Sequence, residues 1–144
     1  MNPPAVTETK EKKMANAHDT VAAHYAAGAA GDIPSMFKDF SDDIVWKESD
    51  GSPYAGSYRG MAEVGAKIFE RINSEWEGFG AVPDYLVTDE ATGTVAAVCT
   101  YVGTFRATGK PQNVRVVHLW TVKDGKVVAF EQVCDTAEQF KSMS

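Results

Sequence analysis

The second half of the chain alternates apolar and polar residues with a period of two, which is typical of β-strands. The pattern predicts three or four long strands, roughly over residues 81–89, 94–106, 113–123 and 126–135. The segments EATG and KDGK between them have the composition of hairpin turns. One strand, in the segment NVRVVHLWTVKDGKVVAF, contains a histidine among apolar residues. This residue, His118, shares a face with Val116 and Trp120, so we expect it to be buried.

The first half of the chain shows helical spacing. Val21, Tyr25 and Ala29 recur on one face of an alanine-rich segment, which predicts a helix over residues 15–30. The following GDIPS segment is expected to end this helix and to begin a short second helix that runs to Phe40. Glycine is favoured just after a helix, aspartate at an N-cap and proline in a first turn.

Between the helices and the long strands, IVWKE (residues 44–48) predicts a short strand, and SDGSPYAGSYRG after it predicts a loop. A third helix is expected over residues 61–73, and Thr136 with Gln139 forms a capping box for a short terminal helix. Because helices come first and the sheet second, the fold class is α+β and not βαβ. We expect a cone-shaped fold, in which a strongly curved antiparallel sheet wraps around the N-terminal helices and encloses a pocket.

The composition indicates a single globular domain. The chain has 144 residues, of which 44% are hydrophobic, enough for one domain with a core. We expect a flexible extension over residues 1–13 and a single domain over residues 14–144. A net charge of -6 argues against a nucleic-acid partner, and no apolar run approaches the roughly 20 residues that cross a membrane. Without a signal-peptide pattern we expect a cytoplasmic protein, with Cys99 and Cys134 as reduced, buried thiols.

Standard catalytic motifs are absent from the sequence: we find no G-x-S-x-G, no Walker motif and no dinucleotide-binding glycine pattern. The histidines are not spaced as a local metal site, so neither a metal nor a cofactor is expected. Glu48 follows Trp46 by two residues, so both project to one face of their strand. If that face lines the pocket, desolvation raises the pKa of Glu48, as a general base requires. Alternatively, Glu48 ends the strand and reaches solvent.

The turn at Asp124-Gly125 decides which residue lies opposite His118. A two-residue turn places Glu131 there, whereas a three-residue turn with Gly125 in the left-handed conformation shifts the register by one residue. In the second register Gln132 lies opposite His118, and Phe130 shares its face. Either register gives the imidazole a polar partner.

Three segments of the chain resemble a known family. They are HYAAGAAGDIPSMFKDFSDDIVWKES, GSYRG, and VVHLWTVKDGKVVAFEQVCDTA near the C-terminus. Together they are similar to the nuclear transport factor 2-like superfamily over roughly residues 15–140, with the closest likeness to its SnoaL-like and ketosteroid isomerase-related branch. The resemblance implies the cone-shaped fold and a homodimer formed through the sheet. It also favours the register that places Gln132 beside His118, and we expect these two residues to be hydrogen-bonded near Glu48.

The resemblance implies positions for the chemistry. In ketosteroid isomerases a carboxylate base follows the first strand, and a first-helix tyrosine and a neutral aspartic acid stabilise the oxyanion. This pattern places Glu48 at the base, His24 at the tyrosine and His118 at the aspartic acid, although none has the isomerase's residue type. SnoaL-like cyclases pair a strand histidine with an aspartate base on the next strand. His118 matches that histidine, and Gln132 occupies the position of the aspartate.

These features predict cofactor-free acid–base chemistry, of isomerase, cyclase or hydratase type, on a small hydrophobic carbonyl compound. Glu48 takes the proton, and His118, helped by His24 or Gln132, donates a hydrogen bond to the oxyanion. The expected pocket walls are Trp46, Tyr58, Tyr101, Trp120 and Phe130. One alternative is a domain that binds a small hydrophobic ligand without reaction. Another is an interaction domain whose pocket is filled by its own side chains.

Overall fold

The computed structural model describes residues 16–144, so the extension expected over residues 1–13 lies outside the described part. The strands are β1 (Phe40–Glu48), β2 (Gly56–Arg59), β3 (Trp76–Asp89), β4 (Thr94–Phe105), β5 (Lys110–Pro111), β6 (Val114–Lys123) and β7 (Lys126–Cys134). The helices are α2 (Ala17–Ala29), α3 (Ile33–Phe37), α4 (Met61–Val64), α5 (Glu70–Glu75) and α6 (Thr136–Met143). A π-helical turn, Gly65–Phe69, joins α4 to α5.

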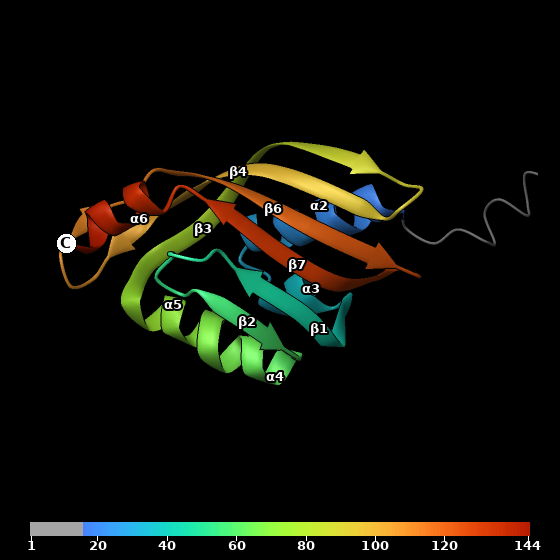
Figure 1. Cartoon of the computed structure of the whole chain (residues 1–144), viewed down its shortest axis with the longest axis horizontal. Helices are drawn as coiled ribbons and strands as arrows, with labels where there is room; N and C mark the ends of the chain where they lie inside the picture. Colours follow the sequence, from blue (N-terminus) through green and yellow to red (C-terminus); the bar gives the residue numbers. More distant parts are fainter. Residues whose placement is uncertain (1–15) are drawn as a thin grey trace, which may run out of the picture.

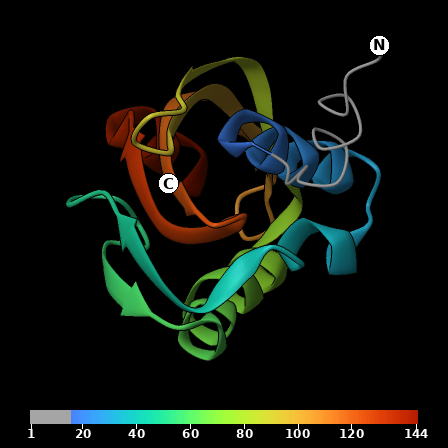
Figure 2. The same ribbon diagram turned by 90° about the vertical axis from the view of Figure 1, so that its right-hand side faces the viewer.

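All seven strands belong to one curved sheet, in the order β2-β1-β7-β6-β4-β3, with β5 paired to β4 (Figure 1). Helix α2 packs against β3, β4 and β6, and the α4–α5 helix packs against β1 and β3 (Figure 2). The expected α+β fold with a strongly curved sheet is therefore confirmed. One strand pair differs from the antiparallel expectation, because β1 runs parallel to β7.

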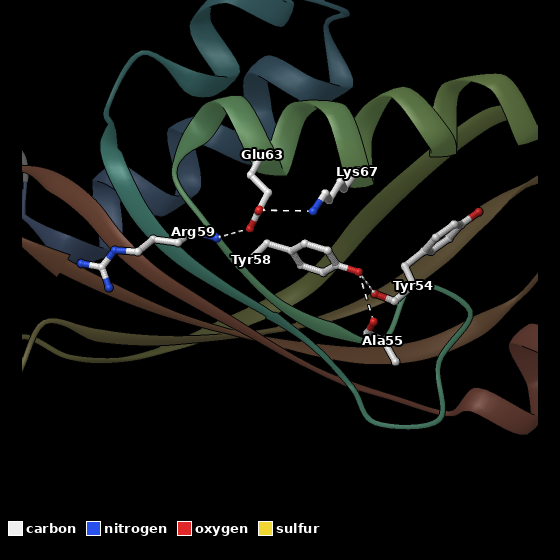
Figure 3. A network of polar contacts seen from close by, with 6 residues as sticks. All are labelled: Tyr54, Ala55, Tyr58, Arg59, Glu63 and Lys67. Carbon is white, nitrogen blue, oxygen red and sulfur yellow. Dashed lines mark hydrogen bonds and ion pairs between the residues drawn. The ribbon is translucent and has the colours of Figure 1, made fainter.

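Strand β2 corrects the loop that we expected over residues 49–60. Residues Gly56–Arg59 pair antiparallel with the end of β1, with Tyr58 opposite Trp46. The Tyr58 hydroxyl donates to the carbonyl oxygens of Tyr54 and Ala55, at 2.9 and 3.1 Å, and so holds the turn before β2 (Figure 3). A four-residue edge strand is too short to show an alternating pattern, which is why its glycine and serine content dominated the prediction.

Further boundaries differ from the expectation. The second helix, α3, ends at Phe37, and Phe40, its expected end, is the first residue of β1, four residues before the predicted start of that strand. Strand β3 begins at Trp76, five residues earlier than predicted, because EGFG continues the strand through a bulge between Glu77 and Gly80. The terminal helix is capped by Asp135, whose side chain accepts from the backbone N–H of Glu138 at 3.2 Å, and not by Thr136. The N-cap predicted at Asp32 is confirmed.

The β6–β7 hairpin places Gln132 opposite His118, as the family resemblance favoured. The turn itself has two residues, Asp124 and Gly125, both with positive φ, and not the three that this register was expected to need. The shift comes from a bulge further along the hairpin, where the pairing passes from Val122 opposite Val127 to Thr121 opposite Ala129. The extra residue in β7 turns Phe130 and Gln132 toward the concave side.

Gly103 in β4 allows β3 to approach closely at its bulge. An added Cβ at this position would lie 2.9 Å from the Cα of Phe79 and 3.1 Å from the carbonyl oxygen of Gly78. The φ of Gly103 is +122°, a conformation that residues with a side chain rarely adopt. The segment of β3 that bends here lines the cavity described below.

We predict that Gly103→Ala destabilises the protein far more than Gly31→Ala. Both glycines have positive φ, but an added Cβ at Gly31 meets nothing within 4 Å. The Gly31 variant should therefore lose only about 1 kcal/mol of unfolding free energy, from backbone strain. The Gly103 variant should lose at least about twice as much, since the backbone of β3 must also move. Urea denaturation of the two variants tests this, and equal losses would contradict the close approach.

Candidate active site

A cavity of about 650 Å³ lies between the concave side of the sheet and the helices. Its buried walls combine aromatic rings with a few polar groups, among them Glu48, His118 and Gln132. The lining residues that are exposed mark its opening: Gly28, Ala29, Ile33, Asn73, Gly78, Val82 and Arg106. The volume is typical of small-molecule sites. A cavity of this size counts against the interaction-domain hypothesis, which expected the pocket to be filled by side chains.

Glu48 lies inside the cavity and not in solvent. As the last residue of β1 it is 3% exposed, and its Oε2 accepts a hydrogen bond from the indole Nε1 of Trp46 at 2.8 Å. Burial disfavours the carboxylate and raises its pKa to about 7, while Trp46 and Gln132 favour the charged form and offset only part of this effect. Near neutral pH the side chain is therefore divided between a carboxylate and a carboxylic acid.

His118 lies between two tyrosine hydroxyls. The Tyr25 oxygen is 2.6 Å from Nδ1, and the Tyr101 oxygen is 2.8 Å from Nε2. Helix α2 supplies Tyr25, β4 supplies Tyr101 and β6 supplies the histidine, so this cluster joins the helix to the sheet. Burial lowers the pKa of His118 to about 3, so the imidazole is neutral at neutral pH.

The hydrogen bonds of this cluster leave one proton unused. Trp120 donates to the Tyr25 oxygen at 2.9 Å, and the side-chain amide of Gln132 donates to the Tyr101 oxygen at 2.8 Å. A neutral imidazole donates through one nitrogen and accepts through the other. In either tautomer, His118 donates to one tyrosine and accepts from the other. The tyrosine that receives the imidazole N–H keeps its own hydroxyl proton for an acceptor outside the cluster, which for Tyr25 can be the neighbouring Cys99 thiol.

The direct hydrogen bond that we expected between His118 and Gln132 is not formed. Both ring nitrogens of His118 are occupied by the tyrosines, and Gln132 reaches the histidine only through the Tyr101 hydroxyl. The Oε1 of Gln132 accepts from the backbone N–H of Ser49 at 3.1 Å. Gln132 thus links the strand that ends in Glu48 to the histidine cluster.

His24 lines the cavity but does not contact His118. Its Nδ1 donates to the carbonyl oxygen of Met36 at 2.9 Å, which fixes Nε2 as the unprotonated nitrogen of the neutral ring. Burial lowers its pKa, and the ring packs edge-on against Trp120. The helix residue whose side chain reaches His118 is the next one, Tyr25. Its place with Val21 on the apolar face of the helix was the signal that could have identified it.

Four of the five expected wall residues line the cavity: Trp46, Tyr101, Trp120 and Phe130. The rings of Trp46 and Phe130 stack with centroids 3.8 Å apart. Tyr58 is the exception, since its ring lies outside the lining and its hydroxyl is bound to the turn carbonyls. Sequence reasoning missed five further aromatic lining residues: Phe37, Tyr54, Phe69, Trp76 and Phe79.

Within residues 16–144 no group of three or more His, Cys, Asp or Glu side chains could hold a metal ion. No helix in the same range is long and apolar enough to span a membrane. Cys99 and Cys134 are free thiols, the first buried and the second half-buried.

Comparison with known proteins gives the same fold. Residues 21–130 match the family described as SnoaL-like domain. A crystal structure of an NTF2-like protein from Burkholderia thailandensis is 39% identical, covers 91% of this chain and 99% of its own, and superposes with a TM-score of 0.84. An NTF2-like protein of unknown function from Burkholderia pseudomallei is 27% identical, with the same coverage and a TM-score of 0.79.

A more distant structure is TerC, co-crystallised with polyporic acid. It is 21% identical, covers 88% of this chain and 97% of its own, and has a TM-score of 0.75. No curated protein sequence matches the chain.

The burial of Glu48 predicts a pH-dependent gain in stability for Glu48→Gln. A carboxyl group with a pKa of about 7 in the folded protein and 4.5 in the unfolded chain makes folding less favourable as the pH rises through this interval. The variant should match the wild type near pH 4.5 and exceed it by up to about 3 kcal/mol above pH 7. Burial of His118 has the opposite effect, because it makes folding more favourable as the pH rises from about 3 to 6.5. Both proteins contain His118, so this effect cancels in the comparison.

Urea denaturation at pH 4.5 and pH 8 measures this difference. Glu131→Gln, an exposed residue of β7, is the matched control and should show no such gain. A Glu48→Gln effect that is the same at both pH values would mean that the carboxyl group is solvated.

Proposed function

The chain belongs to the SnoaL-like domain family, and on this premise we propose that it catalyses cofactor-free proton transfer on a small, largely apolar carbonyl compound. The observation that carries the proposal is the placement of a buried carboxyl group, Glu48, in the same cavity as a neutral histidine held between two tyrosine hydroxyls. This arrangement provides a base for a C–H proton and a donor for the oxygen that becomes negative.

Glu48 is the proposed general base. Its carboxylate would remove the proton next to the substrate carbonyl and return it to another carbon or oxygen of the same molecule. A base is most effective when its pKa lies near the working pH, which holds for a pKa of about 7. The Trp46 hydrogen bond fixes the orientation of the carboxyl group at the end of β1.

The proposed oxyanion donor is the tyrosine hydroxyl whose proton the His118 cluster leaves unused. Burial raises the pKa values of Tyr25 and Tyr101, so both phenols remain protonated donors. A hydrogen bond to the developing enolate oxygen in a water-poor cavity stabilises the transition state more than the ground state. The two tautomers of His118 let either tyrosine take this role. His118 therefore orients the donors and does not itself contact the oxyanion.

Ligand binding without reaction is the second candidate. TerC, a protein with a similar fold, was co-crystallised with a small organic molecule, polyporic acid. That observation supports a small-molecule ligand for this cavity, with or without a reaction. The two candidates differ in whether Glu48 changes the rate of a reaction.

We predict that the protein accelerates deuterium incorporation next to the carbonyl of aryl alkyl ketones in D₂O, measured by proton NMR. Glu48→Gln should lower this rate by at least about 100-fold, the usual contribution of a general base. Glu131→Gln is the control and should leave the rate unchanged. Tyr25→Phe and Tyr101→Phe should each have a smaller effect than the double variant, because either tyrosine can donate. Binding of the ketone with no Glu48-dependent exchange would leave the second candidate, a ligand-binding domain.

We also propose that two copies of the chain associate through the outer face of the sheet. Neighbouring strands place Tyr85, Val98, Val117 and Val133 in one row across this face. Val133, on the inner strand β7, is 52% exposed, and Tyr85, on the edge strand β3, is 56% exposed, so the row presents apolar surface to water. A second copy would remove this row from water.

A homodimer is expected in sedimentation-velocity experiments at micromolar concentration. Val133→Lys should shift the protein toward the monomer, because a charge in the centre of an apolar interface is costly to desolvate. Phe140→Lys changes an exposed apolar residue of α6, which is not part of the sheet, and should leave the dimer intact. A wild-type monomer at these concentrations would overturn the proposal.

A further inference from the structure

Two side chains of the cavity wall have N–H groups to spare for a ligand: the Arg106 guanidinium and the Gln139 side-chain amide. Arg106 directly follows β4, and Gln139 lies on α6. The two segments are joined where Thr108, two residues after Arg106, donates through its hydroxyl to the carbonyl oxygen of Ser142. Both donors therefore belong to the same end of the molecule.

Arg106 is a cation without a counter-ion in the described residues. One Nη atom donates to the carbonyl oxygen of Asn73 over 3.4 Å, and residues 16–144 contain no ion pair of this side chain. Glu75 is the acidic residue whose carbonyl oxygen accepts the Arg106 backbone N–H, at 2.9 Å. Its carboxylate is bound elsewhere, to the Tyr54 hydroxyl at 2.6 Å and to Arg71 at 3.7 Å. The guanidinium at the cavity opening thus remains available to a ligand.

Gln139 is 1% exposed, and its side chain lines the cavity. Its oxygen accepts from the Cys134 thiol at 3.4 Å, whereas its nitrogen forms no hydrogen bond within the described part of the chain. Because Gln139 lines the cavity, its amide nitrogen can donate to a ligand oxygen there.

The Arg106 guanidinium lies at a distance from the proposed reaction centre. Tyr101 contacts His118, and Arg106, just past the end of β4, follows it by five residues, which is up to about 16 Å between backbone positions in an extended chain. Gln139 lies between them, since its side chain contacts Cys134 at the end of β7. The walls between the two ends are mainly aromatic and aliphatic. A ligand that fills the cavity therefore meets polar groups at both ends and apolar surface between them.

We propose that the ligand is an apolar oxo acid, whose carboxylate binds the Arg106 guanidinium and the Gln139 amide while its carbonyl group lies at the Glu48 and tyrosine end. A guanidinium binds a carboxylate through two parallel hydrogen bonds, which fixes orientation as well as charge. The chain as a whole carries a net charge of -6, so a local cation at the opening offsets the general repulsion of an anion. This inference rests on the proposed function and specifies its substrate class.

Isothermal titration calorimetry at pH 8 tests the proposal with ω-benzoylalkanoates of two to five methylene groups and with their methyl esters. For at least one chain length, the acid should bind the wild-type protein at least tenfold more tightly than its ester. Arg106→Gln should abolish this preference. Arg59→Gln is the matched control, since Arg59 is exposed, lies outside the cavity lining and makes no ion pair within residues 16–144 (Figure 3).

Absence of a carboxylate preference at every chain length would overturn the inference, as would an equal loss in the Arg106 and Arg59 variants. The methyl esters keep the ketone and so report the proposed chemistry alone. Glu48-dependent deuterium exchange on an ester, without a preference for the acid, would remove the carboxylate subsite and keep the proposed function. A carboxylate preference without Glu48-dependent exchange would keep the subsite and remove the catalysis.

Discussion

The candidate site depends on one constraint: a neutral imidazole buried between two phenols. His118 can stay buried because each ring nitrogen has a tyrosine partner, and each tyrosine oxygen has a second donor, from Trp120 or Gln132. Buried polar groups that are fully paired rigidify a core, whereas partly paired ones destabilise it. The cluster also connects α2, β4, β6 and β7. Loss of one member therefore affects both the shape of the cavity and the position of its donors.

Glu48 differs from His118, because hydrogen bonds compensate for only part of the cost of its burial. Its burial beside Trp46 provides few compensating hydrogen bonds, so the folded state disfavours its charge. The same unfavourable environment brings its pKa close to neutrality, where a carboxylate is a useful base. A residue that lowers stability in this way has no structural reason to be where it is, which is why it carries the functional proposal.

The sequence predicted the features that depend on local pattern. Strand periodicity gave β4, β6 and β7 within one or two residues. The spacing of Trp46 and Glu48 placed both on one face of their strand, and the structure shows that this face lines the cavity. What it could not predict depends on contacts between distant segments. The bulge in β7 that sets Gln132 opposite His118 leaves no pattern in the amino-acid composition. This bulge, and not the predicted three-residue turn, produces the register.

In helix α2, too, the sequence could not show which residue contacts the sheet. His24 and Tyr25 are adjacent, so the choice between them turns on a rotation of about 100° that only packing against the sheet decides. The family resemblance placed His24 at the position of the isomerase's tyrosine, although Tyr25 lies with Val21 on the apolar face of the helix. The two tyrosine partners of His118 also come from elements 93 and 17 residues away in the sequence, and no local pattern links them.

The parallel pairing of β1 with β7 has a consequence for how the protein is made. The partners Trp46 and Phe130 are separated by most of the chain, so their contact has a high contact order and forms slowly compared with the neighbouring hairpins. During synthesis, β1 must wait for β7 to leave the ribosome before it finds its place in the sheet. Until then the Trp46 ring lacks the Phe130 ring that stacks on it, and the Glu48 carboxyl group lacks Gln132 beside it. The environment that raises the pKa of Glu48 is therefore complete only once the last strand has joined the sheet.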